Sequence, residues 1–178
     1  MRVFLFLSTL TIILVLPRSG SAQVGPFVTS VSAGATFPVG NLGDLNKTGV
    51  NANAVVGYRA HGSKQTFGIE VGWHQLQQIT VPADSLGKVY SNIIVVMARY
   101  DHDLSSGVYV TGGFGTVRRE FRIHYANIAI RNTDAKLGFA AGLGITLAKR
   151  FFAEGRVIYE FSKPKANYMV PLSIGVRF

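Results

Sequence analysis

The chain has 178 residues, a formal net charge of +9, no cysteine and only 15% charged residues, and its mean hydropathy is +0.27. Disulfide bonds and anchoring through a lipidated cysteine are therefore excluded, and the charged fraction falls below the roughly one quarter that is typical of soluble domains. The basic excess does not indicate nucleic-acid binding, because the sequence contains no recognition helix, zinc motif or aromatic RNA-binding signature.

The amino-terminal segment has the three parts of a secretory signal peptide. Arg2 supplies a short positive region, residues 3–16 form an almost unbroken apolar run, and small residues precede Gln23. The run is too short for a comfortable transmembrane helix. We therefore expect cleavage at this point, which makes residues 1–22 a signal peptide and residues 23–178 a single mature domain.

After this segment, apolar residues alternate with small or polar residues, which is typical of β-strands that have one apolar face. Residues 66–74 show the pattern most clearly, with Phe67, Ile69 and Val71 on one face and Glu70 on the other. In chain order, the alternation predicts eight strands, at residues 27–37, 50–59, 66–74, 91–101, from 108 onward, 135–147, 151–161 and 168–178.

Two of these segments need a further argument. Residues 91–101 are apolar on both faces, and we place Ile94 and Val96 on the outer face, so that Arg99 points inward. Residues 135–147 could also form a helix, but each of their alternating glycines would cost a helix about 1 kcal/mol. A strand is therefore the better interpretation of both segments.

The connections between the predicted strands alternate in length. Short turns follow the second, fourth and sixth strands, at residues 59–64, 101–107 and 149–150. Longer connections follow the odd-numbered strands, at residues 38–49, 75–90, 118–134 and 162–167. An antiparallel up-and-down barrel with both termini in the periplasm has short periplasmic turns and longer external loops in this order.

The last strand indicates that this barrel spans a membrane. Residues 168–178 alternate in polarity and have the length of about 9 to 11 residues that a tilted strand needs to cross a bilayer. A lone strand would expose unpaired backbone groups to lipid, so the strands must close on one another. The sequence therefore predicts an all-β fold, an eight-stranded antiparallel transmembrane barrel.

The chain resembles the small eight-stranded outer-membrane barrels of the OmpA/OmpX type. The resemblance rests on the opening Gly34-Ala-Thr-Phe-Pro-Val-Gly-Asn-Leu-Gly-Asp44, on the glycine-rich alternating strands and on the terminal Phe178. It implies a bacterial outer-membrane location with periplasmic termini, and members with structural, adhesive, transport and lipid-modifying roles. It also implies that the barrel assembly machinery reads a signal in the last strand, formed here by Tyr168, Ile174, Val176 and Phe178.

Charged and polar residues on the predicted inner face form the most informative candidate site. The set comprises Arg59, Glu70, His74, Arg99, Glu154, Arg156, Glu160 and Arg177. Eight strands enclose an interior only just wide enough for side chains, and buried charges must be paired. Two interpretations stay open at this point: a polar plug that satisfies itself, and an ion path or gate.

The connection after the fifth strand could extend as a hairpin beyond the membrane, because its apolar residues continue to alternate. Its protruding edge would be basic through Arg118, Arg119, Arg122 and Arg131. Such an edge could contact lipopolysaccharide phosphates, or it could pair as a strand with a neighbouring surface. An ordinary solvated loop is the alternative.

No catalytic or metal motif emerges from the remaining residues. The histidines His61, His74, His102 and His124 fall in a turn, the lumen, a turn and a loop. An enzyme acting on lipid would need a histidine at the lipid-facing rim. Asp101-His-Asp103 resembles a fragment of a metal site, but such residues are usually turn formers. We expect no catalytic residue, no metal and no cofactor.

These observations together predict a non-enzymatic outer-membrane barrel with a plugged polar lumen and a structural or surface-interaction role. Its expected partners are outer-membrane lipids, lipopolysaccharide and the assembly machinery, with no nucleic acid, and we expect a monomer. The alternatives are a small-solute porin-like channel, a barrel enzyme that modifies the acyl chains of lipid A, and a soluble lipocalin-like barrel with its apolar faces turned inward.

Overall fold

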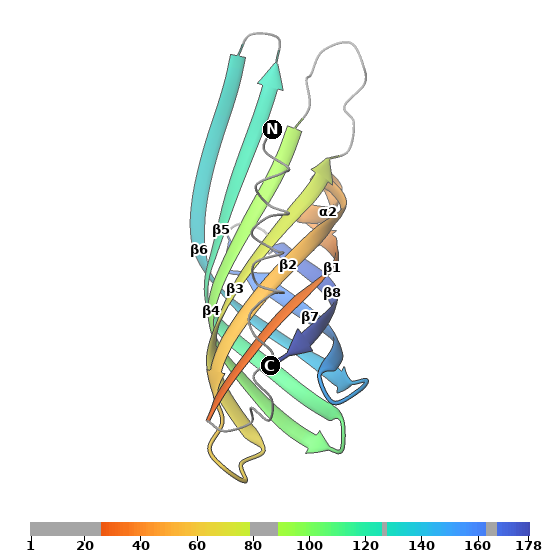
Figure 1. Ribbon diagram of the computed structural model, residues 1–178. Helices are drawn as coiled ribbons and strands as arrows, with labels where there is room; N and C mark the ends of the chain where they lie inside the picture. The colour runs from red at the N-terminus through yellow and green to blue at the C-terminus, as the bar shows by residue number, and fades with distance from the viewer. Residues whose placement is uncertain (1–25, 79–88, 126–127, 163–166) are drawn as a thin grey trace.

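The computed structural model describes residues 26–78, 89–125, 128–162 and 167–178. The expected signal peptide, residues 1–22, lies outside these ranges. The described residues form one closed antiparallel barrel in which each strand pairs with its sequence neighbours and the first pairs with the last (Figure 1). The strands are β1 (Phe27–Gly40), β2 (Asn46–Tyr58), β3 (Gln65–Gln78), β4 (Val89–Ser105), β5 (Val108–Tyr125), β6 (Ile128–Thr146), β7 (Phe151–Glu160) and β8 (Asn167–Arg177). The predicted eight-stranded antiparallel fold is confirmed.

A short helix, α2 (Asn41–Leu45), joins β1 to β2. Much of the predicted connection at residues 38–49 is therefore regular structure, because both flanking strands run further than the alternation indicated. Within the described ranges, no helix is long and apolar enough to cross a membrane.

The outer surface of the barrel is apolar. On β3, the side chains of Phe67, Ile69 and Val71 are 50–62% exposed, whereas Glu70 between them is 1% exposed. The same arrangement recurs around the barrel, for example with Leu143 on β6. An apolar outer face and a charged inner face suit a barrel surrounded by hydrocarbon, and they contradict the lipocalin-like alternative, which requires the opposite arrangement.

Three neighbouring strands are longer than the sequence predicted. β4, β5 and β6 have 17, 18 and 19 residues, and β5 pairs with β6 continuously up to Tyr125 and Ile128. The expected loop at residues 118–134 is therefore mostly strand: residues 118–123 of β5 pair with β4 on one side and with β6 on the other, and the β5–β6 end projects from one end of the barrel (Figure 1). We call residues 118–125 and 128–136 the ribbon. The hairpin predicted after the fifth strand is confirmed, and the alternative of an ordinary solvated loop is contradicted, because cross-strand pairing continues to Tyr125 and Ile128.

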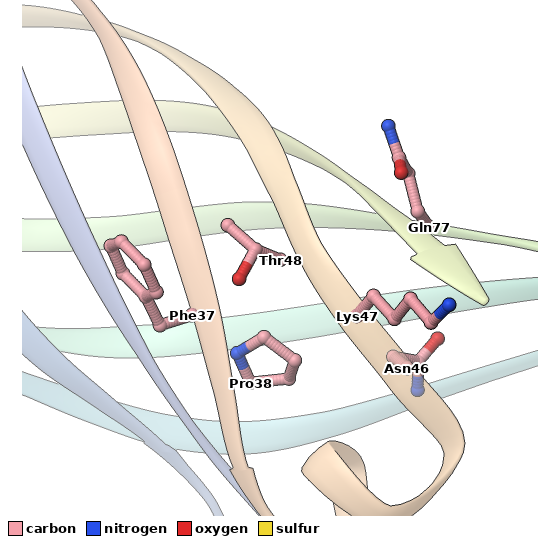
Figure 2. A pocket seen from close by; sticks show the side chains of 6 residues that line it. All are labelled: Phe37, Pro38, Asn46, Lys47, Thr48 and Gln77. Carbon is pink, nitrogen blue, oxygen red and sulfur yellow. The ribbon is translucent and has the colours of Figure 1, made fainter. Parts of the chain in front are cut away.

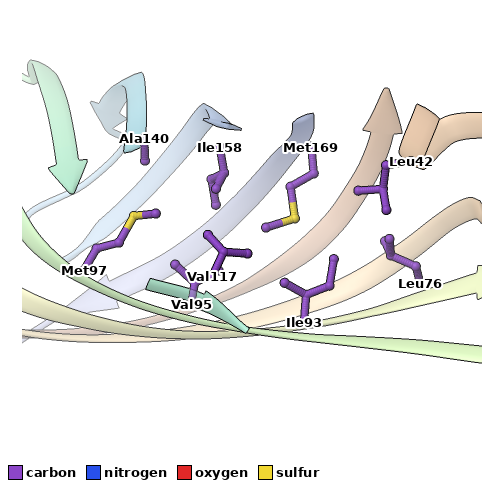
Figure 3. Close-up of a cluster of buried hydrophobic side chains, with 9 residues drawn as sticks. All are labelled: Leu42, Leu76, Ile93, Val95, Met97, Val117, Ala140, Ile158 and Met169. Atoms are coloured by element: carbon purple, nitrogen blue, oxygen red, sulfur yellow. The ribbon is translucent and has the colours of Figure 1, made fainter. Parts of the chain in front are cut away.

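The interior is not polar throughout. Nine buried side chains form an apolar cluster inside the barrel (Figure 3): Leu42, Leu76, Ile93, Val95, Met97, Val117, Ala140, Ile158 and Met169. Three of them come from the inner face of β4, which explains why that strand is apolar on both faces. The expectation of a polar lumen therefore holds for only part of the barrel.

Candidate functional site: the charged interior

Four charged side chains form a closed ring across the barrel. Glu70 lies on β3, Arg99 on β4, and Glu154 and Arg156 lie on β7, on the far side of the strand order. All four are at most 8% exposed. They alternate in sign, and each guanidinium bonds both carboxylates. We call these four residues the charged ring.

Arg99 makes the largest number of contacts in the charged ring. Its Nη1 lies 3.0 Å from Glu70 Oε2, its Nη2 lies 2.5 Å from Glu154 Oε2, and its Nε donates to Asp101 Oδ1 at 2.8 Å. Arg156 completes the ring through Nη1, 2.5 Å from Glu70 Oε2, and Nε, 2.9 Å from Glu154 Oε1. Planar guanidinium groups suit this task because they present several donors in fixed directions.

Aromatic side chains flank the charged ring toward the end of the barrel that carries the short turns. The Tyr109 hydroxyl donates to Glu154 Oε2 at 2.9 Å, and the ring of Tyr109 lies over Gly144, where any Cβ would overlap it. The Arg177 guanidinium lies 5.2 Å from the centroid of Tyr109 and 5.6 Å from that of Phe152. Arg177 is therefore held by cation–π contacts rather than by a carboxylate of the charged ring.

His74 belongs to a separate, uncharged network. The side chain is fully buried, and its Nδ1 is 2.9 Å from Thr36 Oγ1. Asn51 donates to the same hydroxyl at 3.1 Å, and Ser173 donates to Asn51 Oδ1 at 2.8 Å. This network links β1, β2, β3 and β8 beside the charged ring.

The two remaining predicted interior charges lie toward opposite ends of the barrel. Arg59 follows β2 at the short-turn end and is 2.9 Å from Asp103, and both side chains are partly exposed. Glu160 ends β7 at the ribbon end, where it pairs with Arg119 and lies 3.8 Å from Lys136. The eight residues predicted for the interior therefore divide among several clusters and do not form one network.

Sequence reasoning missed two members of the main cluster. Asp101 was predicted as both the last residue of a strand and the first residue of a turn, and it was not counted among the inner-face charges, yet β4 continues through it and it bonds Arg99. Tyr109 was given no polar role. Applying the alternation to the last residue of the predicted strand would have found Asp101, whereas the Tyr109 contact depends on a residue 45 positions away.

The arginines predicted for an external basic edge do not form a free basic surface. Arg119 lies on the inner face and pairs with Glu160. Arg122 and Arg131 both bond Glu120 on the outer face, and Arg118 is exposed. The assignment of all four to one exposed edge was wrong, because alternation along β5 sends Arg118 and Arg119 to opposite faces.

Glu120 lies beyond the apolar belt, since the outer face of β5 is polar from Thr116 onward. Hydrogen bonding to Arg122, together with the charge of Arg131, holds the pKa of the Glu120 carboxyl below its ordinary value of 4.5. The ribbon therefore keeps this cross-strand link ionised at neutral pH.

The last strand closes the barrel. Val176 pairs with Val31 on β1 and with Phe151 on β7, and the backbone N–H of Phe178 donates to Thr29 O at 2.8 Å. Ile174 and Phe178 are 65% and 50% exposed on the lipid side, and Tyr168 pairs with Val39 of β1. These positions suit the proposed assembly signal, which stays a prediction.

No group of three or more His, Cys, Asp or Glu residues in the described part of the chain could hold a metal ion. Both carboxylates of Asp101-His-Asp103 are ion-paired with arginine side chains. The four charged-ring residues likewise satisfy one another. The chemistry available here is charge compensation inside a barrel.

The fold and the composition of its two faces define a small outer-membrane barrel. Residues 5–178 match the family model of the outer membrane protein beta-barrel domain, and the chain belongs to this family. Membership supports a location in the bacterial outer membrane. None of the curated proteins matches the chain.

Solved structures share the fold at low sequence identity. The attachment invasion locus protein Ail of Yersinia pestis is 15% identical, with 86% of this chain and 99% of that chain covered and a TM-score of 0.63. The N-terminal barrel domain of Pseudomonas aeruginosa OprF is 16% identical, with 86% and 98% covered and a TM-score of 0.56. Neisserial surface protein A is 20% identical, with 85% and 94% covered and a TM-score of 0.53. At these identities, the likeness concerns the fold alone.

Proposed function

We propose that the protein is a sealed, non-conducting outer-membrane barrel with a structural or surface-interaction role. The observation that carries this proposal is the stacking of two different barriers in one lumen. The charged ring crosses the barrel, and the apolar cluster lies next to it on the ribbon side. Going from Arg99 toward the ribbon end, the next inner-face residues of β4 are Met97, Val95 and Ile93.

Each barrier opposes ion passage for its own reason. A permeating ion would have to replace contacts of Arg99 and Arg156 with buried carboxylates, which leaves uncompensated charge in a poorly solvated interior. It would then have to pass tightly packed apolar side chains, which exclude water. These barriers favour the plug over the porin-like alternative.

We expect no conductance steps from the folded protein in planar bilayers. A variant that carries Glu70→Gln, Arg99→Gln, Glu154→Gln and Arg156→Gln should also stay silent, because the apolar cluster remains in place. Heat-modifiable migration on gels verifies that each sample is folded. Stable steps from the unsubstituted protein would contradict the proposal, and steps that appear only in the variant would identify the charged ring as a gate.

The ribbon supports the surface-interaction part of this role. Among the described residues, β6 pairs with β7 only from Gly138 to Thr146, so residues 128–136 pair with β5 alone. A free strand edge of this kind can add a strand from another protein. We propose that the ribbon faces the cell exterior, that both termini are periplasmic, and that the barrel is a monomer.

The proposed orientation can be tested with single cysteines, because the chain has none of its own. A membrane-impermeant maleimide should label Asn132→Cys, in the ribbon, on intact cells. It should label Ser106→Cys, in the turn between β4 and β5, only after the outer membrane is permeabilised. The reverse pattern would show that the ribbon faces the periplasm.

We also propose the partners that this role implies, namely the outer-membrane lipids and lipopolysaccharide that surround the barrel and the assembly machinery that inserts it. The placement of His74 favours a non-enzymatic role over lipid A modification, because this side chain is fully buried in the interior and bonds Thr36 there.

A further inference from the structure

The barrel wall has a notch where β1 and β2 separate. The pairing between these strands ends at Thr36 and Gly49, but both strands continue toward the ribbon end. β1 stays paired with β8 up to Gly40, and β2 stays paired with β3 from Asn46. The helix α2 connects the two separated ends.

A hollow of about 530 Å³ occupies this notch. Figure 2 shows the side chains that line it, from β1, β2 and β3: Phe37, Pro38, Asn46, Lys47, Thr48 and Gln77. The lining combines a cation, two amides, a hydroxyl and an apolar wall. Sugars and their phosphates are bound by this combination of donors, acceptors and apolar contacts.

A β-bulge directs two consecutive polar side chains outward in the notch. The register of β2 against β3 shifts between Lys47 and Val50. As a result, Lys47 and Thr48 are both exposed, whereas Asn46 and Gly49 on either side are buried. Bulges re-aim side chains in this way, often beside binding sites.

Two polar groups of the hollow have unused bonding capacity. Asn46 is 4% exposed and donates through Nδ2 to Leu42 O at 2.9 Å, but its buried Oδ1 accepts no hydrogen bond from the described residues. Lys47 makes no ion pair in the part of the chain that the structure describes, unlike Arg119, Arg122 and Arg131 of the ribbon. A buried acceptor beside a free cation indicates a ligand with hydroxyl donors and negative charge.

The level of the notch in the membrane identifies the occupant. Hydrocarbon cannot satisfy the backbone groups of two separated strands, so the notch has to lie among the lipid headgroups. The adjoining outer-face residues of β2 agree with this level, because Val50 is 53% exposed and the next exposed side chains toward the ribbon end, Thr48 and Lys47, are polar.

We propose that the notch binds the phosphorylated sugar headgroup of an outer-leaflet glycolipid. Lys47 Nζ donates to the phosphate, Asn46 Oδ1 accepts from a sugar hydroxyl, and the Thr48 hydroxyl bonds the sugar as well. Phe37 contacts the apolar part of the lipid where it enters the bilayer. The assignment to the outer leaflet rests on the proposed orientation, whereas the site itself does not.

The test uses the folded protein in phosphatidylcholine nanodiscs, which present both leaflets. Native mass spectrometry then measures competition among diphosphoryl lipid A, dephosphorylated lipid A and phosphatidylglycerol. Diphosphoryl lipid A should be retained best. Lys47→Met should weaken it about tenfold, as expected for a lost charge-assisted hydrogen bond, and should leave dephosphorylated lipid A unchanged. Thr48→Val should weaken both forms of lipid A.

Lys149→Met is the matched control, because Lys149 is exposed in the turn between β6 and β7 at the opposite end. It should bind like the unsubstituted protein. Equal binding by Lys47→Met and Lys149→Met would overturn the phosphate contact, and equal retention of phosphatidylglycerol and lipid A would overturn the sugar contact. If lipid A binds as expected but the cysteine in the ribbon is labelled only from the periplasm, the assignment to the outer leaflet is wrong, whereas the binding site itself stands.

Discussion

Replacing Arg99 with methionine should lower the free energy of unfolding by about 3–5 kcal/mol, because it removes one side of a buried ion-paired network. The substitution takes the guanidinium away from Glu70, Glu154 and Asp101 at once. Asp101 loses its only ion-pair partner among the described residues, whereas the two glutamates keep Arg156. Uncompensated negative charge then remains in the barrel.

The midpoint of urea unfolding in lipid vesicles measures this loss. Arg118→Met is the matched control, since Arg118 is exposed and the described residues offer it no ion pair, so its effect should stay within about 0.5 kcal/mol. Adding Asp101→Asn to Arg99→Met should restore part of the stability, because it removes the carboxylate that lost its partner. Equal midpoints for Arg99→Met and Arg118→Met would show that the charged ring does not stabilise the barrel.

The second large effect is expected at Gly144. A methyl group there would overlap the ring of Tyr109, whose hydroxyl holds Glu154. Gly144→Ala should therefore force Tyr109 out of place and destabilise the barrel by about 1–3 kcal/mol, the usual cost of overpacking. The same unfolding measurement reports it.

A double-mutant cycle isolates this contact. In the background of Tyr109→Leu, where the aromatic ring is absent, Gly144→Ala should cost much less than it does alone. Gly112→Ala is the control, because the nearest atom to a Cβ at that position is 3.9 Å away. If Gly144→Ala costs the same in both backgrounds, the packing of Tyr109 on this glycine does not explain the loss.

The fold could be predicted because its signal is local. Alternation with a period of two sets which residues share a face, and it correctly placed Glu70 inside and Phe67 outside. The signal weakened in two places for physical reasons. On β4 it could not distinguish lipid from the apolar cluster, since both environments favour the same side chains. On β5 and β6 the alternation continued past the point where the outer face becomes polar, so it indicated a hairpin, but it did not show that cross-strand pairing runs unbroken from the barrel into that hairpin.

The composition of the interior could be predicted, but its connections could not. Arg99 and Glu154 are 55 residues apart, and they meet because β4 and β7 face each other across a closed lumen. Which inner-face residues meet across the lumen depends on strand tilt and stagger, and alternation does not encode either of these. For the same reason, the division of the predicted charges among several clusters was not foreseen, and neither was the notch between β1 and β2.

The charged ring also bears on how the barrel can form. Two of its members lie on β3 and β4, among the first four strands, and the other two lie together on β7. A sheet that stopped growing after β6 would present Glu70 and Arg99 to the membrane without their partners on β7. Curling β7 around to these residues also brings β8 to the open edge of β1. Pairing of the buried charges and closure of the barrel between β8 and β1 are thus coupled. This coupling raises the free energy of intermediates in which the sheet is only partly closed.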